Sequence, residues 1–350
     1  MPRVTSLDVA RRAGVSQSAV SRAFTAGASV SAETRAKVMA AAEELGYRPN
    51  KIARSLITRR SGIVGIVAAY LDNPYYPAIL EKLSRRLQAR GYHAMMFFTG
   101  QSNDPMDDVL RELLEYQIDG LVMVSAGLSS AFAARCSAAG IPVVLFNRTL
   151  DDESLSAVSS DNRAGGRQVA RFLIENGHER IAYLAGWPGS STNRDRRQGF
   201  IEELARNGRT LFAEDVGNYE RVATCAAIRR LFSGPSRPDA VFCANDHMAA
   251  AALDTLRHKL GIDVPGEVSI VGYDDAPMAD WPSYALTTVS QPAEEMVEAA
   301  VRILLANIEA KAPAPERVIV EGALILRGSA RIAALQHGEN HRIQRNVPRD

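Results

Sequence analysis

The sequence predicts an α/β protein in which a small all-α head precedes two lobes, each built on a doubly wound parallel sheet. From residue 62 onward, short apolar runs alternate with helical stretches. This alternation is typical of parallel sheets with helices on both faces. The runs fall into two sets, which indicates two lobes. The first 60 residues instead contain three short helical segments and no strand pattern.

Composition excludes several other classes of protein. Hydrophobic residues make up 46% of the 350 residues and charged residues 23%, which is enough for a sizeable core. The longest stretch without Asp, Glu, Lys or Arg has 15 residues, whereas a membrane helix needs roughly 20 apolar ones. No secretory signal is visible, and the three cysteines lie far apart. We therefore expect a cytoplasmic protein without disulfides, metal, cofactor or membrane contact.

Charge is distributed unevenly along the chain. Residues 1–60 contain eleven Lys and Arg against four Asp and Glu, whereas the remaining residues contain 30 against 36. A basic head on a mildly acidic body is typical of a nucleic-acid-binding protein with a separate second function. The alternative is a solvated basic face without a partner.

Capping residues predict three helices in the head, residues 1–49. Each helix is preceded by a hydroxyl side chain that can accept a hydrogen bond from the first turn, and Asp8 lies where a capping box needs an acid. The predicted caps are Thr5, Ser16 and Ser31, and the glycines that end helices are Gly14 and Gly46. Two short helices joined at a glycine, with a third across them, indicate a helix-turn-helix bundle.

The second helix of the head presents polar side chains opposite its apolar residues. Gln17, Ser18 and Arg22 project from that polar face. Arginine can bind guanine with two hydrogen bonds, and glutamine can bind adenine, in the major groove of DNA. The alternative is an ordinary polar face on a small bundle.

A hinge helix is predicted for residues 50–61, with Asn50 as its cap. It spans only two turns, and isolated helices of that length are marginal in water. Basic residues, including Arg54, flank Leu56. A leucine in this setting is suited to wedge into the minor groove of bent DNA. The alternative is a plain linker helix.

Polar residues follow the predicted strands of the body, where ligands bind in open α/β sheets. Amide, carboxylate and guanidinium groups can bind vicinal hydroxyls, and an aromatic ring can stack on a sugar. The candidate residues for a carbohydrate or similar ligand are Tyr75, Tyr76, Ser125, Asn147, Asp161, Arg196, Asn245 and Asp274. The alternative is that the Asn and Asp residues cap helices and the tyrosines belong to the core.

The segment from VTSLDVARRAGVSQSAVSRAF to RPNKIARSL resembles the DNA-binding head and hinge of the LacI/GalR repressor family. The body, with NPYYPAIL, ANDHMA and EVSIVGYDD, resembles the two-lobed, periplasmic-binding-protein-like effector module of the same family. The resemblance implies that Arg196, Asn245 and Asp274 face an effector, with Tyr75, Tyr76, Asn147 and Asp161 as further candidates. The DNA-binding candidates are Thr5, Ser16, Gln17, Ser18, Ser21, Arg22, Asn50, Ala53, Arg54 and Leu56.

The same resemblance implies how the lobes are built. Three crossovers, near Ser160, Ser290 and Arg317, join a first lobe of residues 62–160 and 291–316 to a second lobe of residues 161–290 and 317–330. The tail, residues 331–350, is polar and lacks the leucine heptads of tetrameric members. We therefore expect a homodimer on a pseudo-palindromic operator of double-stranded DNA.

The predicted function is a DNA-binding transcription regulator, a repressor controlled by a small polar effector such as a sugar. A cytosolic α/β enzyme is one alternative, but dinucleotide, phosphate-loop and nucleophile-elbow motifs do not occur. His337 and His341 lie four residues apart in the polar tail without the order of a zinc motif. A solute-binding protein with a basic N-terminal extension is the other alternative, against which the basic head argues.

Overall fold

A computed structural model describes most of the chain. The described residues are 4–24, 28–48, 60–98, 106–125, 132, 135–136, 138–151, 153–310 and 314–333. They form two compact units, residues 1–61 and residues 62–350.

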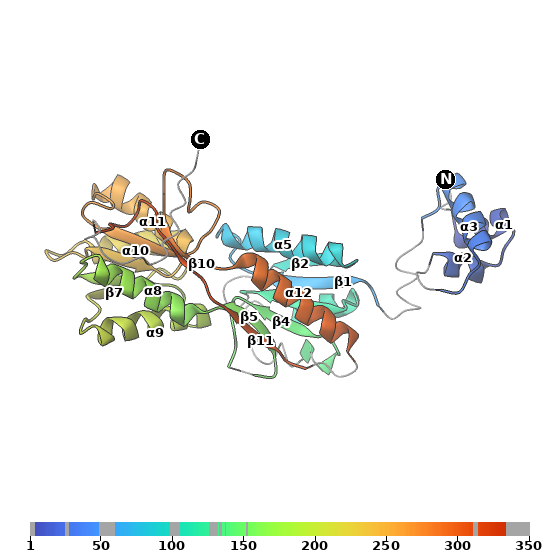
Figure 1. Ribbon diagram of the computed structural model, residues 1–350, viewed down its shortest axis with the longest axis horizontal. Coiled ribbons are helices and arrows are strands. Elements are labelled where there is room, and N and C mark those ends of the chain that lie inside the picture. The colour runs from blue at the N-terminus through green and yellow to red at the C-terminus, as the bar shows by residue number, and fades with distance from the viewer. Residues whose placement is uncertain are drawn as a thin grey trace, which may run out of the picture. The chain divides into compact units, whose positions relative to one another are not determined.

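The described part of the head contains three helices, as predicted (Figure 1). They are α1 (Ser6–Ala13), α2 (Gln17–Ala23) and α3 (Ala32–Glu44). The capping box is confirmed, because Thr5 Oγ1 accepts from the Asp8 amide at 3.4 Å and Asp8 Oδ2 accepts from the Thr5 amide at 2.9 Å. Ser16 and Ser31 cap the other two helices. Each helix therefore begins where its capping side chain satisfies an amide of the first turn.

Small apolar side chains form the core of the head. Val9, Val20 and Val38, one from each helix, are buried together with four alanines. The Arg12 guanidinium pairs with Glu44 at 2.6 Å, which adds a polar contact between α1 and α3. Because alanine and valine let helix axes approach closely, three short helices can share one core.

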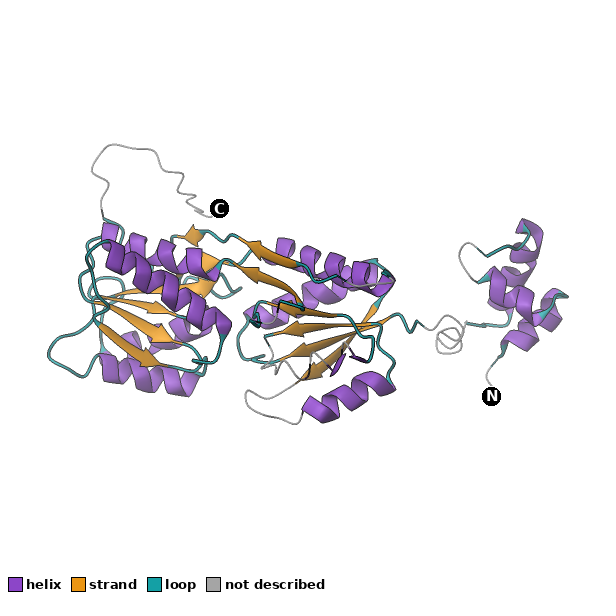
Figure 2. Cartoon of the chain, turned by 90° about the horizontal axis from the view of Figure 1, so that it is seen from below, coloured by secondary structure: helices purple, strands orange, loops and turns teal. Residues whose placement is uncertain are grey.

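The described residues of the body form two six-stranded sheets with helices on both faces of each (Figure 2). The first sheet has the order β11 (Arg317–Val320), β5 (Ser156–Ser160), β4 (Val143–Phe146), β3 (Gly120–Val124), β1 (Ile63–Ala68), β2 (His93–Phe98). The second has the order β12 (Leu324–Ile325), β10 (Thr287–Ser290), β9 (Ser269–Asp274), β8 (Ala240–Cys243), β6 (Ile181–Ala185), β7 (Ala213–Val216). All the pairings are parallel except that of β10 with β12.

The alternation of side chains along each strand explains the layers of the first lobe. On β1, Val64 and Ile66 face the core beneath α5 (Tyr75–Ala89) and α12 (Ala293–Glu309), whereas Val67 faces a second core that contains Leu113 of α6 (Met106–Glu115). Both faces of the strand are therefore buried, which is why its sequence is apolar throughout.

The second lobe has one large core, with four helices and a short π-helix around its sheet. They are α8 (Asn162–Glu175), α9 (Ser191–Arg206), α10 (Arg221–Leu231), α11 (Asp246–Thr255) and the π-helix Leu256–Leu260. Two elements of this lobe, β7 and α10, carry no clear signal in the sequence. β7 is a short edge strand with the mixed sequence AEDV and only partial burial, so the apolar signal of a central strand is absent.

Glycines bring α8 and α9 into close contact. A Cβ on Gly166 would lie 2.1 Å from the Arg196 carbonyl oxygen, and a Cβ on Gly199 would lie 2.0 Å from the Arg163 carbonyl oxygen. Both obstacles are backbone atoms, which cannot move aside as a side chain can. The two glycines therefore fix how α9 lies against α8.

We expect Gly166→Ala to lower the free energy of unfolding by about 2–4 kcal/mol, because the added methyl group must push two helix backbones apart. Urea denaturation measures this change. Gly234→Ala is the matched control, since the atom nearest to its Cβ is 3.7 Å away. Equal stability of the two variants would contradict the close packing.

One predicted boundary is wrong. The sequence predicts that residues 317–320 belong to the second lobe, but β11 pairs in parallel with β5, Arg317 opposite Ala157, and so belongs to the first sheet. The chain changes lobes after Val320, and only β12 joins the second sheet. A Cβ on Gly322 would lie 2.0 Å from the Ser290 carbonyl oxygen, so two crossovers pass in contact at this glycine. In the sequence, β11 and β12 belong to one apolar run, RVIVEGALILR, which shows no boundary between the two lobes.

Arg331, the first residue of the predicted tail, packs against His178, which follows the end of α8. The His178 side chain is fully buried, with Nδ1 3.1 Å from Nη2 of Arg331 and 3.6 Å from Oδ1 of Asp239. Burial lowers the pKa of His178, Arg331 lowers it further, and Asp239 opposes both. The imidazole is therefore held neutral beside a cation.

This arrangement predicts acid sensitivity. The unfolded chain binds a proton at His178 more readily than the folded chain, so the stability that this site contributes is lost as the pH falls below about 6.5, the ordinary value of histidine. We expect the free energy of unfolding to fall more between pH 7.5 and 5.5 in the wild type than in His178→Gln. Parallel pH curves for the wild type and His178→Gln would contradict the prediction.

Candidate functional site

The head presents a polar helix face suited to base contacts. Ala19, Val20 and Ala23 of α2 are buried, and this leaves Gln17, Ser18, Ser21 and Arg22 exposed. In this structure, Gln17 Nε2 donates to Ser6 Oγ at 2.9 Å, and the Ser16 and Ser18 hydroxyls lie 2.9 Å apart. These are exposed contacts that DNA can replace. Asn50, Ala53, Arg54 and Leu56, with most of the predicted hinge helix, lie outside the described residues.

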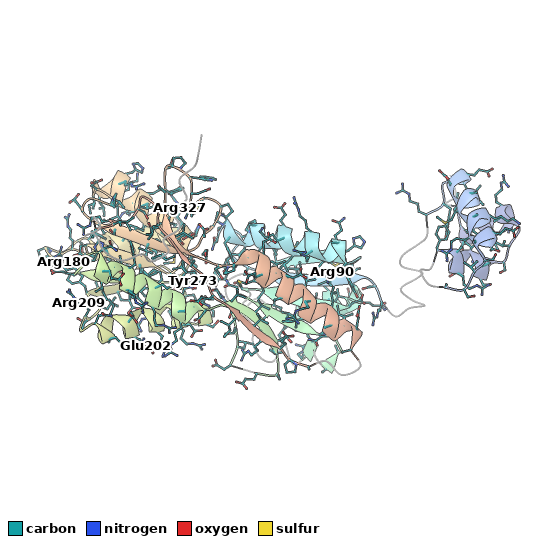
Figure 3. All side chains as sticks on the ribbon, viewed as in Figure 1. Arg90, Arg180, Glu202, Arg209, Tyr273 and Arg327 are labelled. Carbon is teal, nitrogen blue, oxygen red and sulfur yellow. The ribbon has the colours of Figure 1, made fainter. Side chains whose placement is uncertain are left out.

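Most of the eight effector candidates lie at or just after the ends of strands, whereas Arg196 lies within α9. Seven of them are buried, and Asp161 is half-buried. Polar side chains that gather in a buried place need partners, so their contacts show what the place can hold. Tyr273, labelled in Figure 3, marks the side of the second lobe that faces the first.

Three candidates of the first lobe form one hydrogen-bonded cluster, and Tyr75 packs beside it. Ser125 Oγ donates to the Tyr76 hydroxyl at 2.9 Å, and Asn147 Nδ2 lies 3.2 Å from the same hydroxyl and 3.1 Å from Ser125 Oγ. Burial raises the pKa of Tyr76 to about 12, so its hydroxyl keeps its proton. The Tyr75 ring packs edge-on against Tyr76, with centroids 5.4 Å apart.

An ion pair between Arg196 and Asp274 forms the centre of the second-lobe cluster. Both side chains are almost fully buried, and Nη2 lies 3.5 Å from Oδ1. The Arg196 guanidinium stacks on the Tyr273 ring at 3.6 Å, and its Nε donates to Asn162 Oδ1 at 2.8 Å. Burial opposes the charge of Arg196, but Asp274 and the neighbouring tyrosines together outweigh burial and raise the pKa of Arg196 above its ordinary value. The guanidinium is therefore held charged and flat.

Two residues that the sequence reading missed also bind Asp274. Gln291 Nε2 donates to Oδ1 at 2.7 Å, and Asn73 Nδ2 donates to Oδ2 at 3.2 Å. Asn73 belongs to the first lobe, so Asp274 joins the two lobes. The signal for Asn73 is its place in NPYY directly after the first strand, and the signal for Gln291 is its place at a crossover.

Further contacts join the lobes beside this pair. The Thr149 amide donates to Ser191 Oγ at 2.9 Å, and the rings of Tyr70 and Tyr219 meet edge-on with centroids 5.9 Å apart. The clusters of the two lobes therefore face each other and form one site, which we call the interlobe site.

Asp161 and Asn245 cap helices, as the alternative interpretation of these residues predicts. Asp161 Oδ1 accepts from the Ala164 amide at 2.8 Å and begins α8, and Asn245 Oδ1 accepts from the Met248 amide at 2.9 Å and begins α11. Their roles toward a ligand stay predictions. Asp246 is fully buried and binds the Thr288 hydroxyl and the Ala276 amide, and burial raises its pKa well above the ordinary value.

Several buried polar atoms of the interlobe site have no hydrogen-bond partner. They are Tyr75 Oη, Asn147 Oδ1, Arg148 Nε and Nη1, Arg196 Nη2 and Gln291 Oε1. Buried polar groups are almost always paired in folded proteins, because each unpaired one costs about 1–3 kcal/mol. Donors and two amide acceptors from both lobes, gathered in one place without a hydrogen bond, indicate a site for a polar ligand, although Arg196 Nη2 keeps its ion pair with Asp274.

The backbone at this site is also unusual. Ser125, Asn147 and Asp274 have φ values of 52°, 71° and 126°. Residues other than glycine rarely adopt a positive φ. Tyr70 and Tyr219 share this feature, with φ values of 60° and 63°. Such conformations gather at functional sites, where the surrounding structure holds them.

A basic helix-turn-helix head joined to a two-lobed ligand-binding body defines a ligand-responsive DNA-binding regulator. Comparison with known proteins agrees. Residues 5–50 match the model of the bacterial regulatory proteins of the lacI family, and residues 170–330 match the periplasmic binding protein-like domain. The chain belongs to the LacI family of bacterial transcription regulators.

Relatives match along almost the whole chain. The HTH-type transcriptional regulator CelR of Thermobifida fusca is 35% identical, over 92% of this chain and 96% of the relative. The ribose operon repressor of Escherichia coli K12 is 31% identical, over 93% and 99%. Among solved structures, a lac repressor dimer bound to operator and the anti-inducer ONPF matches with a TM-score of 0.84 and 27% identity, over 94% of this chain and 99% of that chain.

Proposed function

We propose that this regulator is a repressor whose affinity for operator DNA is controlled by a small polar ligand in the interlobe site. The observation that carries the proposal is the set of unpaired buried polar atoms contributed by both lobes. A ligand that pairs them stabilises the closed arrangement of the lobes over any other. It can therefore shift the conformational equilibrium of the body by that differential affinity.

A sugar or sugar derivative fits the chemistry of the site. Amide, guanidinium and hydroxyl groups surround it, and aromatic rings lie beside them. A relative offers support, since a solved CelR is described as a cellobiose complex and matches with a TM-score of 0.71 at 33% identity. We propose Tyr75, Asn147, Arg196, Asp274 and Gln291 as the central ligand contacts, with Tyr76, Ser125, Asp161 and Asn245 around them.

We propose that DNA is bound by a homodimer, as the lac repressor structure suggests by its description as a dimer on operator. Two copies of α2 then read the two halves of a pseudo-palindromic site. Arg22 and Gln17 contact base edges, while helix N-termini and basic side chains hold phosphates. Thr5, Ser16, Ser18 and Ser21 are the further contacts proposed in the head.

No group of three or more His, Cys, Asp or Glu in the described part of the chain is placed to hold a metal. No described helix is long and apolar enough to cross a membrane. The named relatives are regulators rather than enzymes. We propose a cytoplasmic protein that acts by binding.

The proposal is tested with the purified full-length protein in two steps. Selection from a random pool of duplexes yields the operator, and a thermal-shift screen of sugars, sugar acids and polyols yields the ligand. Fluorescence anisotropy then measures operator binding with and without that ligand. We expect the operator affinity to change by about 5–150-fold, the range of ordinary coupling energies. An unchanged affinity at saturating ligand would overturn the proposal.

The hinge supplies a separate prediction. We propose that Leu56 wedges into the minor groove at the centre of the operator, where unstacking costs a few kcal/mol and the bend allows more contacts. Leu56→Gly should therefore lower operator affinity at least about tenfold and leave ligand binding unchanged. Ser55→Gly is the matched control, since it adds the same backbone freedom without removing the wedge. Equal losses in both variants would reject the wedge.

A further inference from the structure

Arg148, which directly follows Asn147 at the end of β4, lies in a box of aromatic rings. Its guanidinium carbon is 4.6 Å from the ring centre of Tyr70, 5.5 Å from that of Trp187 and 5.7 Å from that of Tyr219. Tyr70 belongs to the first lobe, and Trp187 and Tyr219 belong to the second. The residue is 9% exposed, so its charge is largely removed from water.

The charge of Arg148 is not balanced. The two buried arginines of the interlobe site differ, because Arg196 has Asp274 at 3.5 Å, whereas no carboxylate of the described residues forms an ion pair with Arg148. Its Nε and Nη1 are buried without a hydrogen-bond partner. Cation–π contacts recover only part of the cost of burying a charge.

The surroundings of Arg148 are polar on the side of the ligand contacts. Asn147 presents its unpaired Oδ1 nearby, and Tyr76 lies within electrostatic reach of Arg148 and Asp274 alike. The site therefore combines a neutral half, in which Arg196 and Asp274 cancel, with a half that carries one unbalanced positive charge. A neutral sugar would leave that charge unpaired.

We propose that the effector of this regulator is an acidic sugar derivative whose carboxylate or phosphate binds the Arg148 guanidinium. The proposal rests on the interlobe site proposed above and names the chemical class of its ligand. A guanidinium offers two parallel N–H groups to either anion, in hydrogen bonds about twice as strong as neutral ones. The hydroxyl groups of the same molecule would form hydrogen bonds with Asn147, Gln291 and Tyr75.

Matched ligand pairs test the proposal by titration calorimetry on the full-length protein. The pairs are glucose with glucuronate, galactose with galacturonate, glucose with glucose 6-phosphate, and ribose with ribose 5-phosphate. We expect one acidic member to bind at least about tenfold more tightly than its neutral partner, consistent with a hydrogen bond to a charged group. Comparing the uronate pairs with the sugar phosphate pairs shows whether Arg148 prefers a carboxylate or a phosphate.

Two variants separate ligand recognition from a structural role. Arg148→Gln should weaken the acidic ligand by about 10–150-fold, change the affinity of the neutral partner less than about threefold, and leave the melting temperature equal or higher because an unpaired buried charge is gone. Arg194→Gln is the matched control, since Arg194 is half-exposed and already paired with Asp151 and Asp195. It should preserve the preference for the acidic ligand.

The outcomes are distinguishable. Tighter binding of every neutral sugar than of its acidic partner, or an equal loss for both in Arg148→Gln, would overturn the acidic ligand and leave the interlobe site in place. Binding of an acidic ligand that survives Arg148→Gln unchanged would also overturn it. Failure of every sugar, uronate and sugar phosphate to bind would overturn this proposal and the proposed sugar ligand together.

Discussion

Arg196→Ala should abolish the response to the effector, with the ligand affinity lowered at least about 100-fold. Two losses combine in this variant, since the ligand loses a charged donor and the Asp274 carboxylate is left buried without its partner. Calorimetric titration measures the affinity. Operator binding by the ligand-free protein should remain within about threefold of the wild type, because the head is a separate compact unit.

A second variant separates this effect from general damage to the lobe. Arg196 also stacks on Tyr273 and donates to the Ala244 carbonyl, so its loss should lower the free energy of unfolding by about 3–5 kcal/mol. Tyr75→Phe removes only a buried hydroxyl that has no partner. It should raise the free energy of unfolding by about 1 kcal/mol and still weaken the ligand about 2–13-fold.

The opposite signs of these two changes make the test decisive. A residue that serves only the fold cannot gain stability and lose ligand affinity in the same substitution. Normal regulation in Arg196→Ala, or full ligand affinity in Tyr75→Phe together with reduced stability, would remove these residues from the site.

Arg22→Ala should weaken operator binding by about 5–150-fold, which corresponds to about 1–3 kcal/mol for one arginine that reads a guanine. Arg22 is exposed on the polar face of α2, away from the buried side of the helix, so stability should not change. Anisotropy titrations with the operator and with a scrambled duplex measure the effect. The loss should fall on the operator alone, and ligand affinity should not change.

Arg11→Ala is the matched control for this substitution. Arg11 is an exposed arginine on α1, 3.9 Å from Asp8, and its loss removes the same charge from the head. This substitution should lower the affinity for both duplexes modestly and equally, as expected for the loss of a phosphate contact. Equal behaviour of the two variants on the two duplexes would show that Arg22 reads no base.

Much of the fold could be predicted because its signals are local. Thr5, Ser16 and Ser31 each begin a helix because the side chain accepts a hydrogen bond from the amide three residues later. This signal lies within four consecutive residues. The central strands are buried on both faces, so their sequences are apolar throughout. β11 was placed in the wrong lobe because a parallel edge strand is defined by its neighbour, here β5, which lies more than 150 residues away in the sequence.

The interlobe site could be predicted in part, for the same reason. The position after a strand indicated Asn147 and Asp274, because parallel strands bring their carboxyl ends to one edge. Sequence could not show that Asn73 would reach Asp274 from the other lobe, nor that Arg148 would stack among rings from three distant segments. Those contacts depend on how two lobes meet, which no local pattern encodes.

The central claim is that the interlobe site and the DNA-binding head are coupled, and coupling between two binding sites is reciprocal. The direct measurement is the dissociation constant of the effector for the free regulator and for its complex with operator DNA. The account predicts two different constants, whose ratio equals the ratio of operator affinities with and without effector. Identical effector constants in the two titrations would contradict it.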